Sequence, residues 1–348
     1  MRFWEIEQKE LRWLLLESCF GNKGHVIAQS RGTFGDIFTF DQGENSFPRY
    51  GIAKTPRINP ADSPEQIKVK IAKFLHEINE TYKCSNHELI ARHADVKICF
   101  GAPFVYSRKR DKTLQDVLDN QPVSLTESVS IIIQLAHGLG YCSSKGLSSH
   151  QDLKPDNVRT DPIRDHFNAP DDYPLAYRVF VCDFGMANAF SVFGKPFGSR
   201  PYMAPEQYGH PITMAKSDVF ALGVIIHELI SGVHPIGEIT RDIWPVPLPQ
   251  KGNKWKRENV WKAWARSTKS IGLSIIPNSK LASTVGRCLH PDIAYRHSMT
   301  SLEFELLDWL NNEDRLAAAN LKLLLSTYDN NAATAEVSGW PYYEHLPA

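Results

Sequence analysis

The sequence predicts an α+β fold with a small, β-rich first part and a larger, mainly helical second part. Short strand-like runs, several of them rich in β-branched or aromatic residues, recur up to residue 106. From residue 114 onward, apolar residues recur mainly at helical spacing. Strands followed by helices are typical of α+β proteins, so we expect two unequal lobes with a cleft between them.

The bulk composition is that of a folded globular protein. The chain has 348 residues, of which 42% are hydrophobic and 11% aromatic, and this length allows two packed lobes. Lys plus Arg and Asp plus Glu both number 39, so the formal net charge is zero. This balance gives no electrostatic reason to expect nucleic acid or an anionic membrane as a partner. The oligomeric state stays open.

The cysteines and the first residues of the chain indicate the expected cellular location of the protein. Six cysteines are scattered without a CxxC pair, so they suggest neither a zinc site nor a redox motif. Their low density favours reduced thiols in a reducing compartment. The apolar run at residues 13–16 is too short for a secretory signal, and other apolar runs are too short or too interrupted to span a bilayer. We therefore expect a cytoplasmic protein.

The first part is predicted as one helix, five strands and a second helix. Residues 1–20 are predicted as an amphipathic helix that carries Phe3, Ile6, Leu14 and Leu15. Residues 64–83 form the second helix, because their apolar side chains recur at helical spacing. The strands are predicted at residues 25–29, 37–40, 50–54, 96–100 and 104–106.

The second part is predicted as helices interrupted by two inserted segments. Ile131, Leu135 and Leu139 mark one long helix, and residues 219–230 mark a helix that is apolar nearly all round, as buried central helices are. The polar, Pro-containing segments 159–177 and 239–254 read as insertions whose role stays open.

A helix is also predicted near the end of the chain. Asn312 is its expected cap, Glu313 and Asp314 lie in its first turn, and its apolar residues run from Leu316 to Leu325. We accordingly divide the chain into four parts. These are an N-terminal helical extension (1–24), a first lobe (25–107), a second lobe (108–311) and a C-terminal helical tail of unassigned role (312–348).

Asp152 and Asn157 are the first candidates for a chemical role, because they lie five residues apart on a loop after a long predicted helix. An acid there can orient a hydroxyl group and accept its proton, and an amide oxygen nearby can hold a metal. Lys154 can reach the oxygens of a transferred phosphate, and Asp183 adds a second metal-binding carboxylate. Such hard oxygen ligands favour Mg²⁺, so these residues point to phosphoryl transfer.

Ordered motifs around these residues resemble the eukaryotic-type serine/threonine protein kinase family. Residues 150–157 (HQDLKPDN) resemble its catalytic loop, and residues 183–185 (DFG) resemble its magnesium motif. Residues 198–206 (GSRPYMAPE) resemble the end of its activation segment, and residues 217–223 (SDVFALG) resemble the start of its central helix. Such motifs occur in the family's order from residue 28 to about 310, which is far more specific than one short match.

The resemblance implies a bilobal protein-kinase-like fold, ATP with Mg²⁺ (or Mn²⁺ in its place) as cofactors, and protein substrates. Asp152 would be the catalytic acid and Lys154 would steady the γ-phosphate, while Asn157 and Asp183 would hold the metal. Lys154 in the Asp-Leu-Lys-Pro run is typical of enzymes that phosphorylate serine or threonine. Autophosphorylation is expected as well.

The resemblance also assigns structural roles. His150 is expected to pack against Phe184 of the Asp-Phe-Gly run rather than act as a base, with Gly185 completing that motif. Ser199 would be a structural hydroxyl near the catalytic acid, and Asp218 would hold the backbone of the catalytic loop. Arg296 would form an ion pair with Glu206.

In the first lobe, residues 30–37 (SRGTFGDI) resemble the glycine-rich loop over the ATP phosphates, which assigns Gly32, Gly35 and Ile37 to ATP binding. Ser30 stands where the family has its first glycine. Residues 50–54 resemble the third strand and place Lys54 on the α- and β-phosphates. Glu77 is the first choice for its helical partner, and Glu80, one turn further, is a competitor.

Two departures from the family pattern stand out. Gln151 replaces the arginine that commonly precedes the catalytic acid and binds a phosphate on the activation loop. Between Gly185 and Ala204 the only serine or threonine residues that could accept a phosphate are Ser191 and Ser199. We therefore predict a kinase that does not need activation-loop phosphorylation. The span from Asn157 to Asp183 is also longer than usual, so a surface loop is expected there.

Simpler interpretations compete with each of these assignments. Single Asp and Asn residues are common in turns, and a strand lysine such as Lys54 is usually solvated. Trp255, Trp261 and Trp264 lie among basic residues, but a helix packed on the lobe is a better interpretation than a nucleic-acid surface. Two other functions stay open, a small-molecule phosphotransferase of kinase-like fold and a non-catalytic pseudokinase scaffold.

Overall fold

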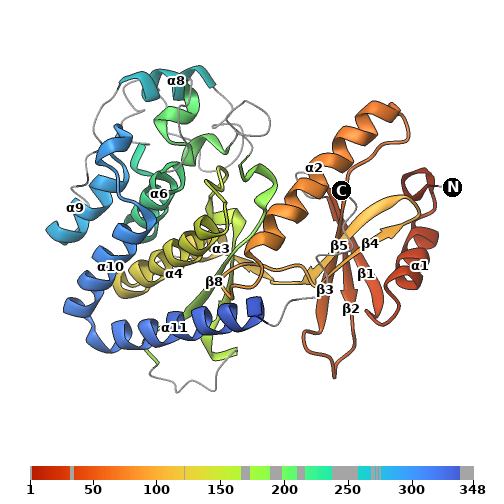
Figure 1. Cartoon of the computed structure of the whole chain (residues 1–348), viewed down its shortest axis with the longest axis horizontal. Coiled ribbons are helices and arrows are strands. Elements are labelled where there is room, and N and C mark those ends of the chain that lie inside the picture. The colour runs from red at the N-terminus through yellow and green to blue at the C-terminus, as the bar shows by residue number, and fades with distance from the viewer. Residues whose placement is uncertain are drawn as a thin grey trace. The chain divides into compact units, whose positions relative to one another are not determined.

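The protein forms two compact units (Figure 1). The N-unit comprises Met1–Ser85 and Ala91–Asp111, and the C-unit comprises Asn86–Ile90 and Lys112–Ala348. The structure is a computed structural model, and it describes residues 2–31, 35–120, 122–165, 173–188, 198–209, 216–236, 258–267, 271, 273 and 276–337. The predicted class is confirmed, since one unit is built on an antiparallel sheet and the other is mainly helical.

The N-unit is built on a five-stranded antiparallel sheet with the strand order β1-β2-β3-β5-β4. All five strands predicted from the sequence are present, most of them a few residues longer than predicted. Their bounds are β1 His25–Arg31, β2 Gly35–Asp41, β3 Tyr50–Pro56, β4 Asp95–Cys99 and β5 Ala102–Arg108. The register places Ile37 of β2 opposite Lys54 of β3, so two residues assigned to ATP binding are cross-strand neighbours.

The first residues depart from the predicted continuous helix over residues 1–20. A 3-10 turn, η1 (Phe3–Glu5), comes first, and α1 (Lys9–Phe20) begins only after the extended residue Ile6. The buried positions of α1 are Leu16 and Phe20, one helical turn apart, whereas Leu14 is 63% exposed. The prediction was wrong here because the break lets Phe3 and Ile6 enter the core of the unit separately.

Aromatic rings dominate the core of the N-unit. Phe104 lies at their centre, with its ring centroid 4.9 Å from Phe3, 6.1 Å from Phe38 and 6.2 Å from Phe20. All four side chains are at most 4% exposed. Edge-to-face and tilted pairs of this kind add to the free energy of apolar burial. The segment before β1 is therefore part of the core of this unit.

Helix α2 (Pro64–Cys84) completes the N-unit, as the apolar spacing predicted. Its start is capped by Ser63, whose hydroxyl accepts a hydrogen bond from the amide of Gln66, while the Gln66 side chain accepts one from the amide of Ser63. Proline at the first helical position suits this start because its missing N–H needs no partner there. Phe74 and Ile78 of this helix are buried in one apolar cluster with Val105 of β5.

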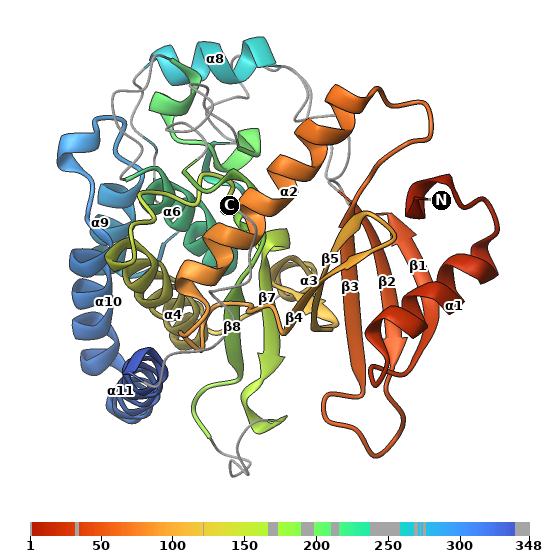
Figure 2. The same cartoon turned by 45° about the vertical axis from the view of Figure 1, so that its right-hand side comes forward.

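The C-unit holds most of the helices (Figure 2). They are α3 (Leu114–Asp119), α4 (Leu125–Ser144), α6 (Ser217–Ser231), α8 (Glu258–Ser267), α9 (Ser279–Cys288), α10 (Met299–Glu313) and α11 (Arg315–Val337). Helix α6 is buried along almost its whole length, as its uniform apolarity predicted. Helix α8 buries Trp261 and Trp264, which confirms the packed-helix interpretation, and Trp255 lies outside the described residues.

A small antiparallel sheet lies in the same unit, where β7 (Val158–Pro162) pairs with both β6 (Lys112–Thr113) and β8 (Tyr177–Val181). Residues 159–162 belong to β7, so the first part of the predicted 159–177 insertion is strand rather than loop. Residues 166–172 and the whole 239–254 segment lie outside the described residues. The short 3-10 turns of the unit are η2 (Pro155–Asn157), η3 (Ile163–Asp165), η4 (Phe184–Met186), η5 (Arg200–Tyr202), η6 (Pro205–Tyr208) and η8 (Ile293–Tyr295).

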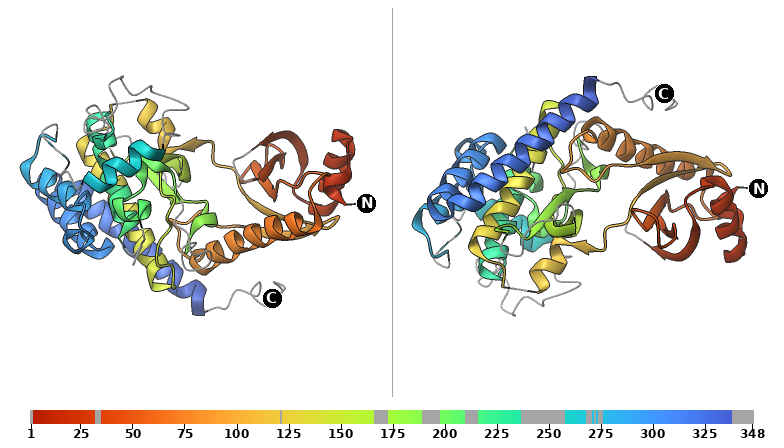
Figure 3. Two further views of the ribbon diagram at one scale, coloured as in Figure 1. Left: turned by 90° about the horizontal axis from the view of Figure 1, so that it is seen from above. Right: turned by 90° about the horizontal axis from the view of Figure 1, so that it is seen from below.

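The predicted C-terminal helix exists, but its cap differs. Asn312 lies in the last turn of α10, where its side chain donates to the carbonyl of Asp308. Asp314 is the extended residue between the helices, and its carboxylate accepts a hydrogen bond from the amide of Ala317. The cap is therefore Asp314, because α10 continues past Asn312 before the chain turns. Helix α11 packs against α4 and α10 (Figure 3).

Candidate active site

The loop that carries Asp152 is held by a buried carboxylate from the first turn of α6. Asp218 accepts hydrogen bonds from the amide of His150 at 2.7 Å and from the amide of Gln151 at 3.0 Å. Burial raises the pKa of Asp218, while His150 and the two amides oppose that shift. Gln151 has a φ of 67°, a left-handed conformation that is uncommon outside glycine. Asp218 thus secures a strained turn directly before the candidate catalytic acid.

Asp152 lies in a cluster of polar side chains and is 6% exposed. The side-chain amide of Asn157 donates to its carbonyl oxygen at 2.8 Å and to its Oδ2 at 3.1 Å. The ammonium group of Lys154 lies 3.0 Å from the same Oδ2 and 2.8 Å from the hydroxyl of Ser199. Among the described residues, the other oxygen, Oδ1, has no hydrogen-bond partner. One oxygen of the carboxylate is thus held by two side chains, while the other is buried without a hydrogen-bond partner in the described part of the chain.

Asp183 follows β8 and is connected to Asn157 through its neighbour. The amide of Cys182 donates to the carbonyl of Asn157 at 3.0 Å, so the chain positions Asp183 directly after a residue bonded to Asn157. Asp183 has a φ of 65° and precedes the η4 turn that contains Phe184 and Gly185. Such backbone conformations cluster at functional sites.

His150 and Phe184 occupy the arrangement expected from the resemblance. Their ring centroids lie 5.0 Å apart, and both side chains are fully buried. Nε2 of His150 lies 3.1 Å from the carbonyl oxygen of Cys182. The imidazole ring therefore connects the loop that carries Asp152 to the segment that carries Asp183.

The donor atoms of Asn157 and Asp183 suit magnesium. Because the Asn157 amide nitrogen donates twice to Asp152, its orientation leaves the amide oxygen as the group that could bind a cation. Asp183 adds a carboxylate, and Mg²⁺ is commonly held by one or two such protein oxygens together with substrate phosphates. The residues present therefore fit a magnesium ion that arrives with a nucleotide.

The segment after residue 197 rests on the same loop. Gly198 has a φ of 146°, and a β-carbon there would lie 2.6 Å from the carbonyl oxygen of Gln151, so only glycine fits. Gln207 donates to that carbonyl at 3.2 Å and accepts from the amide of Ala204 at 2.9 Å. Sequence reasoning missed Gln207, and its neighbourhood in the Ala-Pro-Glu run was the one available signal.

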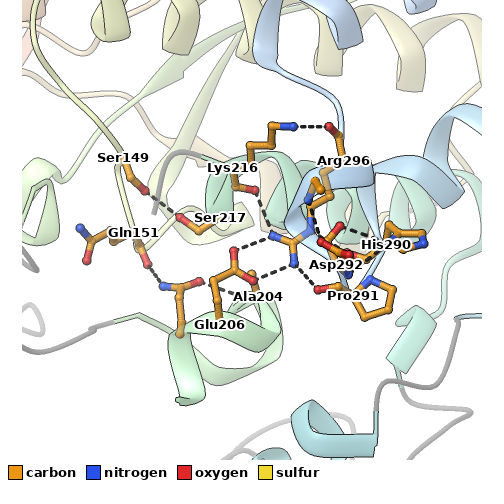
Figure 4. A network of polar contacts seen from close by, with 12 residues as sticks. Ser149, Gln151, Ala204, Glu206, Lys216, Ser217, His290, Pro291, Asp292 and Arg296 are labelled. Carbon is orange, nitrogen blue, oxygen red and sulfur yellow. Dashed lines mark hydrogen bonds and ion pairs between the residues drawn. The ribbon is translucent and has the colours of Figure 1, made fainter. Parts of the chain in front are cut away.

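Glu206 and Arg296 form the expected ion pair (Figure 4). Two nitrogens of the guanidinium group meet the two carboxylate oxygens at 2.6 Å and 2.7 Å, and the arginine side chain has no exposed surface. Arg296 also donates to the carbonyl oxygens of His290 and Pro291. Bidentate, charge-assisted bonds of this kind are geometrically specific, so the pair joins two segments firmly.

Two further contacts support this region and had no signal in the sequence. Lys216 donates to the carbonyl oxygen of Arg296 at 2.6 Å. The hydroxyl groups of Ser149 and Ser217 lie 2.8 Å apart (Figure 4). Both contacts join the start of α6 to distant segments, so they depend on tertiary packing.

The side chain of Gln151 is buried and neutral. The residue is 4% exposed, and neither its amide oxygen nor its amide nitrogen has a hydrogen-bond partner among the described residues. An arginine at this position could bind a phosphate through two charge-assisted bonds, whereas a neutral amide has no charge to offer. Ser191 lies outside the described residues.

In the N-unit, Lys54 contacts Glu77, with its ammonium nitrogen 2.5 Å from the glutamate Oε1. Glu80, the competing partner, lies 2.5 Å from Lys83. A β-carbon on Gly35 would overlap the carbonyl oxygen of Thr55, so pairing of β2 with β3 is enough to explain a glycine there. Gly32, also assigned to ATP binding, lies outside the described residues.

Comparison with known proteins agrees with this arrangement. The protein kinase domain family matches residues 55–305. A probable serine/threonine-protein kinase PknB of Lactococcus lactis is 28% identical over 62% of this chain and 32% of its own length. Serine/threonine-protein kinase PknH of Mycobacterium bovis is 29% identical over 37% of this chain and 21% of its own length. A calcium and calcium/calmodulin-dependent serine/threonine-protein kinase of Lotus japonicus is 31% identical over 48% of this chain and 31% of its own length.

The family match covers well over half of the chain, so the chain belongs to the protein kinase family, as the resemblance predicted. The matches span about a fifth to a third of these relatives' own lengths. Within the part of the chain that the structure describes, no helix is both long and apolar enough to cross a membrane.

Proposed function

We propose that this protein transfers the γ-phosphate of ATP to serine or threonine hydroxyl groups of other proteins, and to its own. The observation that carries the proposal is the carboxylate of Asp152, whose Oδ2 is held by Asn157 and Lys154 while its Oδ1 has no partner among the described residues. That oxygen can accept a hydrogen bond from a substrate hydroxyl and orient it for attack.

Each remaining residue of the site has a role in this proposal. ATP with Mg²⁺ supplies the phosphoryl group and neutralises its charge, and Asn157 and Asp183 are the residues that would hold the ion. Lys154 stabilises negative charge on the transferred phosphate, and Ser199 keeps its ammonium group in position. In the N-unit, Lys54 contacts the α- and β-phosphates, and Glu77 keeps that ammonium group oriented. Gly32, Gly35 and Ile37 form the surface that covers the nucleotide.

Specificity for serine and threonine rests on Lys154. Its ammonium group bridges Asp152 and Ser199, so the lysine is part of the surface that meets the attacking hydroxyl. The names of the relatives agree with this assignment.

A transfer assay with labelled ATP and a generic protein substrate tests the proposal. The wild-type chain should phosphorylate serine and threonine, and Asp152→Asn should lower the turnover about 10²–10⁴-fold while the unfolding curve stays close to that of wild type. Label on a small molecule but on no protein would favour a small-molecule phosphotransferase. A wild-type chain that transfers no phosphate at all would favour a pseudokinase.

We further propose that activity does not require a phosphate on the activation loop. Gln151 offers no positive charge to such a phosphate, and its buried amide has no partner among the described residues. Phosphatase-treated protein should therefore be as active as untreated protein, and Ser191→Ala should match wild type. Loss of activity in either sample would contradict this proposal. Gln151→Arg is the matched variant, because it restores the charge at the same position.

The proposed setting is a cytoplasmic enzyme with protein substrates and the four-part division of the chain given above. The relatives are much longer than their matching segments, so the identity of the substrates is a matter for experiment. Comparing phosphorylated proteins in cells that contain wild type or Asp152→Asn would identify them.

A further inference from the structure

A second group of polar side chains lies in the C-unit and has no part in the kinase site. His87 comes from the Asn86–Ile90 segment, His137 from α4 and Asp329 from α11. One ligand atom from each residue lies within 4.8 Å of the other two. This cluster could not be predicted from the sequence, because its members are far apart along the chain and none belongs to a cysteine-based metal motif.

The spacing of these atoms suits a tetrahedral ion. Oδ1 of Asp329 lies 3.0 Å from Nε2 of His137 and 3.5 Å from Nε2 of His87. Around a tetrahedral Zn²⁺ with ligand bonds of about 2.0–2.1 Å, neighbouring ligand atoms are about 3.3 Å apart. The two observed distances lie on either side of that value, so an ion could enter with shifts of a few tenths of an ångström on those two edges.

His137 is oriented in the way that metal-binding histidines usually are. Its Nδ1 lies 2.8 Å from Oε1 of Glu303 on α10. A hydrogen bond from Nδ1–H to this carboxylate leaves the lone pair of Nε2 directed at the cluster. Carboxylates behind ligating histidines fix the tautomer and raise the basicity of the ring.

His87 supplies a buried nitrogen without a hydrogen bond. Its side chain has no exposed surface, and Nε2 has no hydrogen-bond partner among the described residues. Its Nδ1 accepts one local bond from the amide of Leu89 at 3.2 Å. Metal binding at Nε2 places the ring proton on Nδ1. Binding would therefore cost this one hydrogen bond from Leu89.

We propose that His87, His137 and Asp329 bind a zinc ion, with water as the fourth ligand. Two imidazole nitrogens and one carboxylate oxygen are typical zinc ligands, whereas Mg²⁺ and Ca²⁺ prefer oxygen alone. Asp329 is 53% exposed, so an ion can reach the site from solvent. The bound ion would join α11 to α4 and to the segment that contains His87.

Zinc titration of the full chain, first freed of metal with a chelator, tests the proposal. Calorimetry should give one equivalent of tightly bound Zn²⁺, and zinc at about 100 times its Kd should raise the Tm by roughly 5 °C. Mg²⁺ at the same concentration, without nucleotide, should leave the Tm unchanged. Co²⁺ in place of zinc should give the visible absorption of a four-coordinate ion with nitrogen and oxygen ligands.

Substitutions test whether zinc binds at this cluster or at other histidines of the chain. Asp329→Asn and His137→Gln should weaken zinc binding more than 100-fold, and Glu303→Gln, which keeps all three ligands, should weaken it about 10–100-fold. His25→Gln is the matched control, because His25 is an exposed histidine that also lies near a carboxylate, Glu17. It should bind zinc as wild type does.

Two results would overturn the proposal. The first is a wild-type chain that binds no zinc, which would leave His137 as a hydrogen-bonded link between Glu303 and Asp329. The second is equal binding by wild type, Asp329→Asn and His137→Gln, which would place the ion elsewhere. Because a variant could be misfolded, each is compared with wild type by circular dichroism in metal-free buffer, and the cobalt spectrum of wild type gives a readout without any variant.

Discussion

The N-unit is stabilised by one kind of contact, and the candidate active site of the C-unit is stabilised by another. In the N-unit, rings from η1, α1 and β2 surround Phe104 of β5, and the position of Lys54 follows from the register of β2, β3 and β5. In the C-unit, the loop with Asp152 is positioned by polar groups, chiefly Asp218, Gln207 and Asn157.

This difference shows what each kind of contact is suited to. Apolar packing is non-directional, so it stabilises a unit while leaving the exact direction of a side chain to the sheet. Hydrogen bonds are directional, and a buried one is expensive to leave unmade, so a network of them specifies the conformation of an irregular loop. The loop that carries Asp152 is not part of a strand or an α-helix and therefore depends on such a network.

The largest expected effect is in the aromatic core. Phe104→Ala should lower the free energy of unfolding of the N-unit by about 4 kcal/mol, because it leaves a cavity among three other rings. Hydrogen exchange should show the loss in the amides of β3 and β5 and spare those of α6. Phe104→Leu, which keeps most of the apolar volume, should lose less. Equal loss of protection in α6 would mean that the two units do not unfold separately.

The second-largest expected effect is the loss of the buried ion pair between Glu206 and Arg296. Arg296→Met should lower the free energy of unfolding of the C-unit by about 3 kcal/mol, because Glu206 loses its charge partner and several carbonyl groups lose a donor. Urea unfolding with hydrogen exchange in α6 measures it. Arg287→Met is the matched control, since that exposed pair with Glu305 should contribute less than about 1 kcal/mol. Similar losses for both variants would show that burial of the pair does not matter.

The buried carboxyl of Glu127 should make stability depend on pH. Burial raises its pKa to about 7 from the ordinary 4.5, although the amides of Ala176 and Tyr177 donate to it. The folded state therefore binds a proton that the unfolded state releases, so stability falls as the pH rises from about 4.5 to about 7, by about 3 kcal/mol at most.

Urea unfolding across that pH range measures the slope. Glu127→Gln should flatten it, whereas Glu10→Gln, at an exposed position, should leave it as in wild type. A slope that is unchanged by Glu127→Gln would assign the pH dependence to other groups.

The smallest expected effect is in the N-unit ion pair. Glu77→Gln should lower the free energy of unfolding of the N-unit by only about 1 kcal/mol, because glutamine can still accept a hydrogen bond from Lys54. A double-mutant cycle with Lys54→Met should give a coupling energy of about 1 kcal/mol. Glu80→Gln in the same cycle should give a coupling near zero, since Glu80 contacts Lys83. A larger coupling for Glu80 would reverse the assignment.

Much of the fold was predictable because its patterns are local. The strands and the long helices follow from apolar residues at spacings of two or about 3.6, which depend only on neighbours in the sequence. The two errors of the helical prediction fall at ends. The break after η1 and the cap at Asp314 depend on how flanking residues pack, and no local pattern encodes that.

The candidate site was predictable to a different extent. Asp152, Lys154 and Asn157 are close in sequence, so their proximity in space followed from the loop that carries them. The choice between Glu77 and Glu80 as the partner of Lys54 could not be made from the sequence, because it depends on the rotation of α2 against the sheet. Gln207 and Lys216 were missed because they act through backbone carbonyl groups, which carry no residue signature.

By itself, the sequence determined the class of fold, the family and the residue types of the candidate site, since residue types at fixed short spacings carry that information. Only the tertiary structure decided which distant groups meet. Asp218 reaches a loop 68 positions away, and Arg296 reaches Glu206 across 90 positions. The cluster of His87, His137 and Asp329 likewise exists only once three separate segments have packed together. Contacts between residues so far apart depend on the packing of whole elements, and no single stretch of sequence specifies that packing.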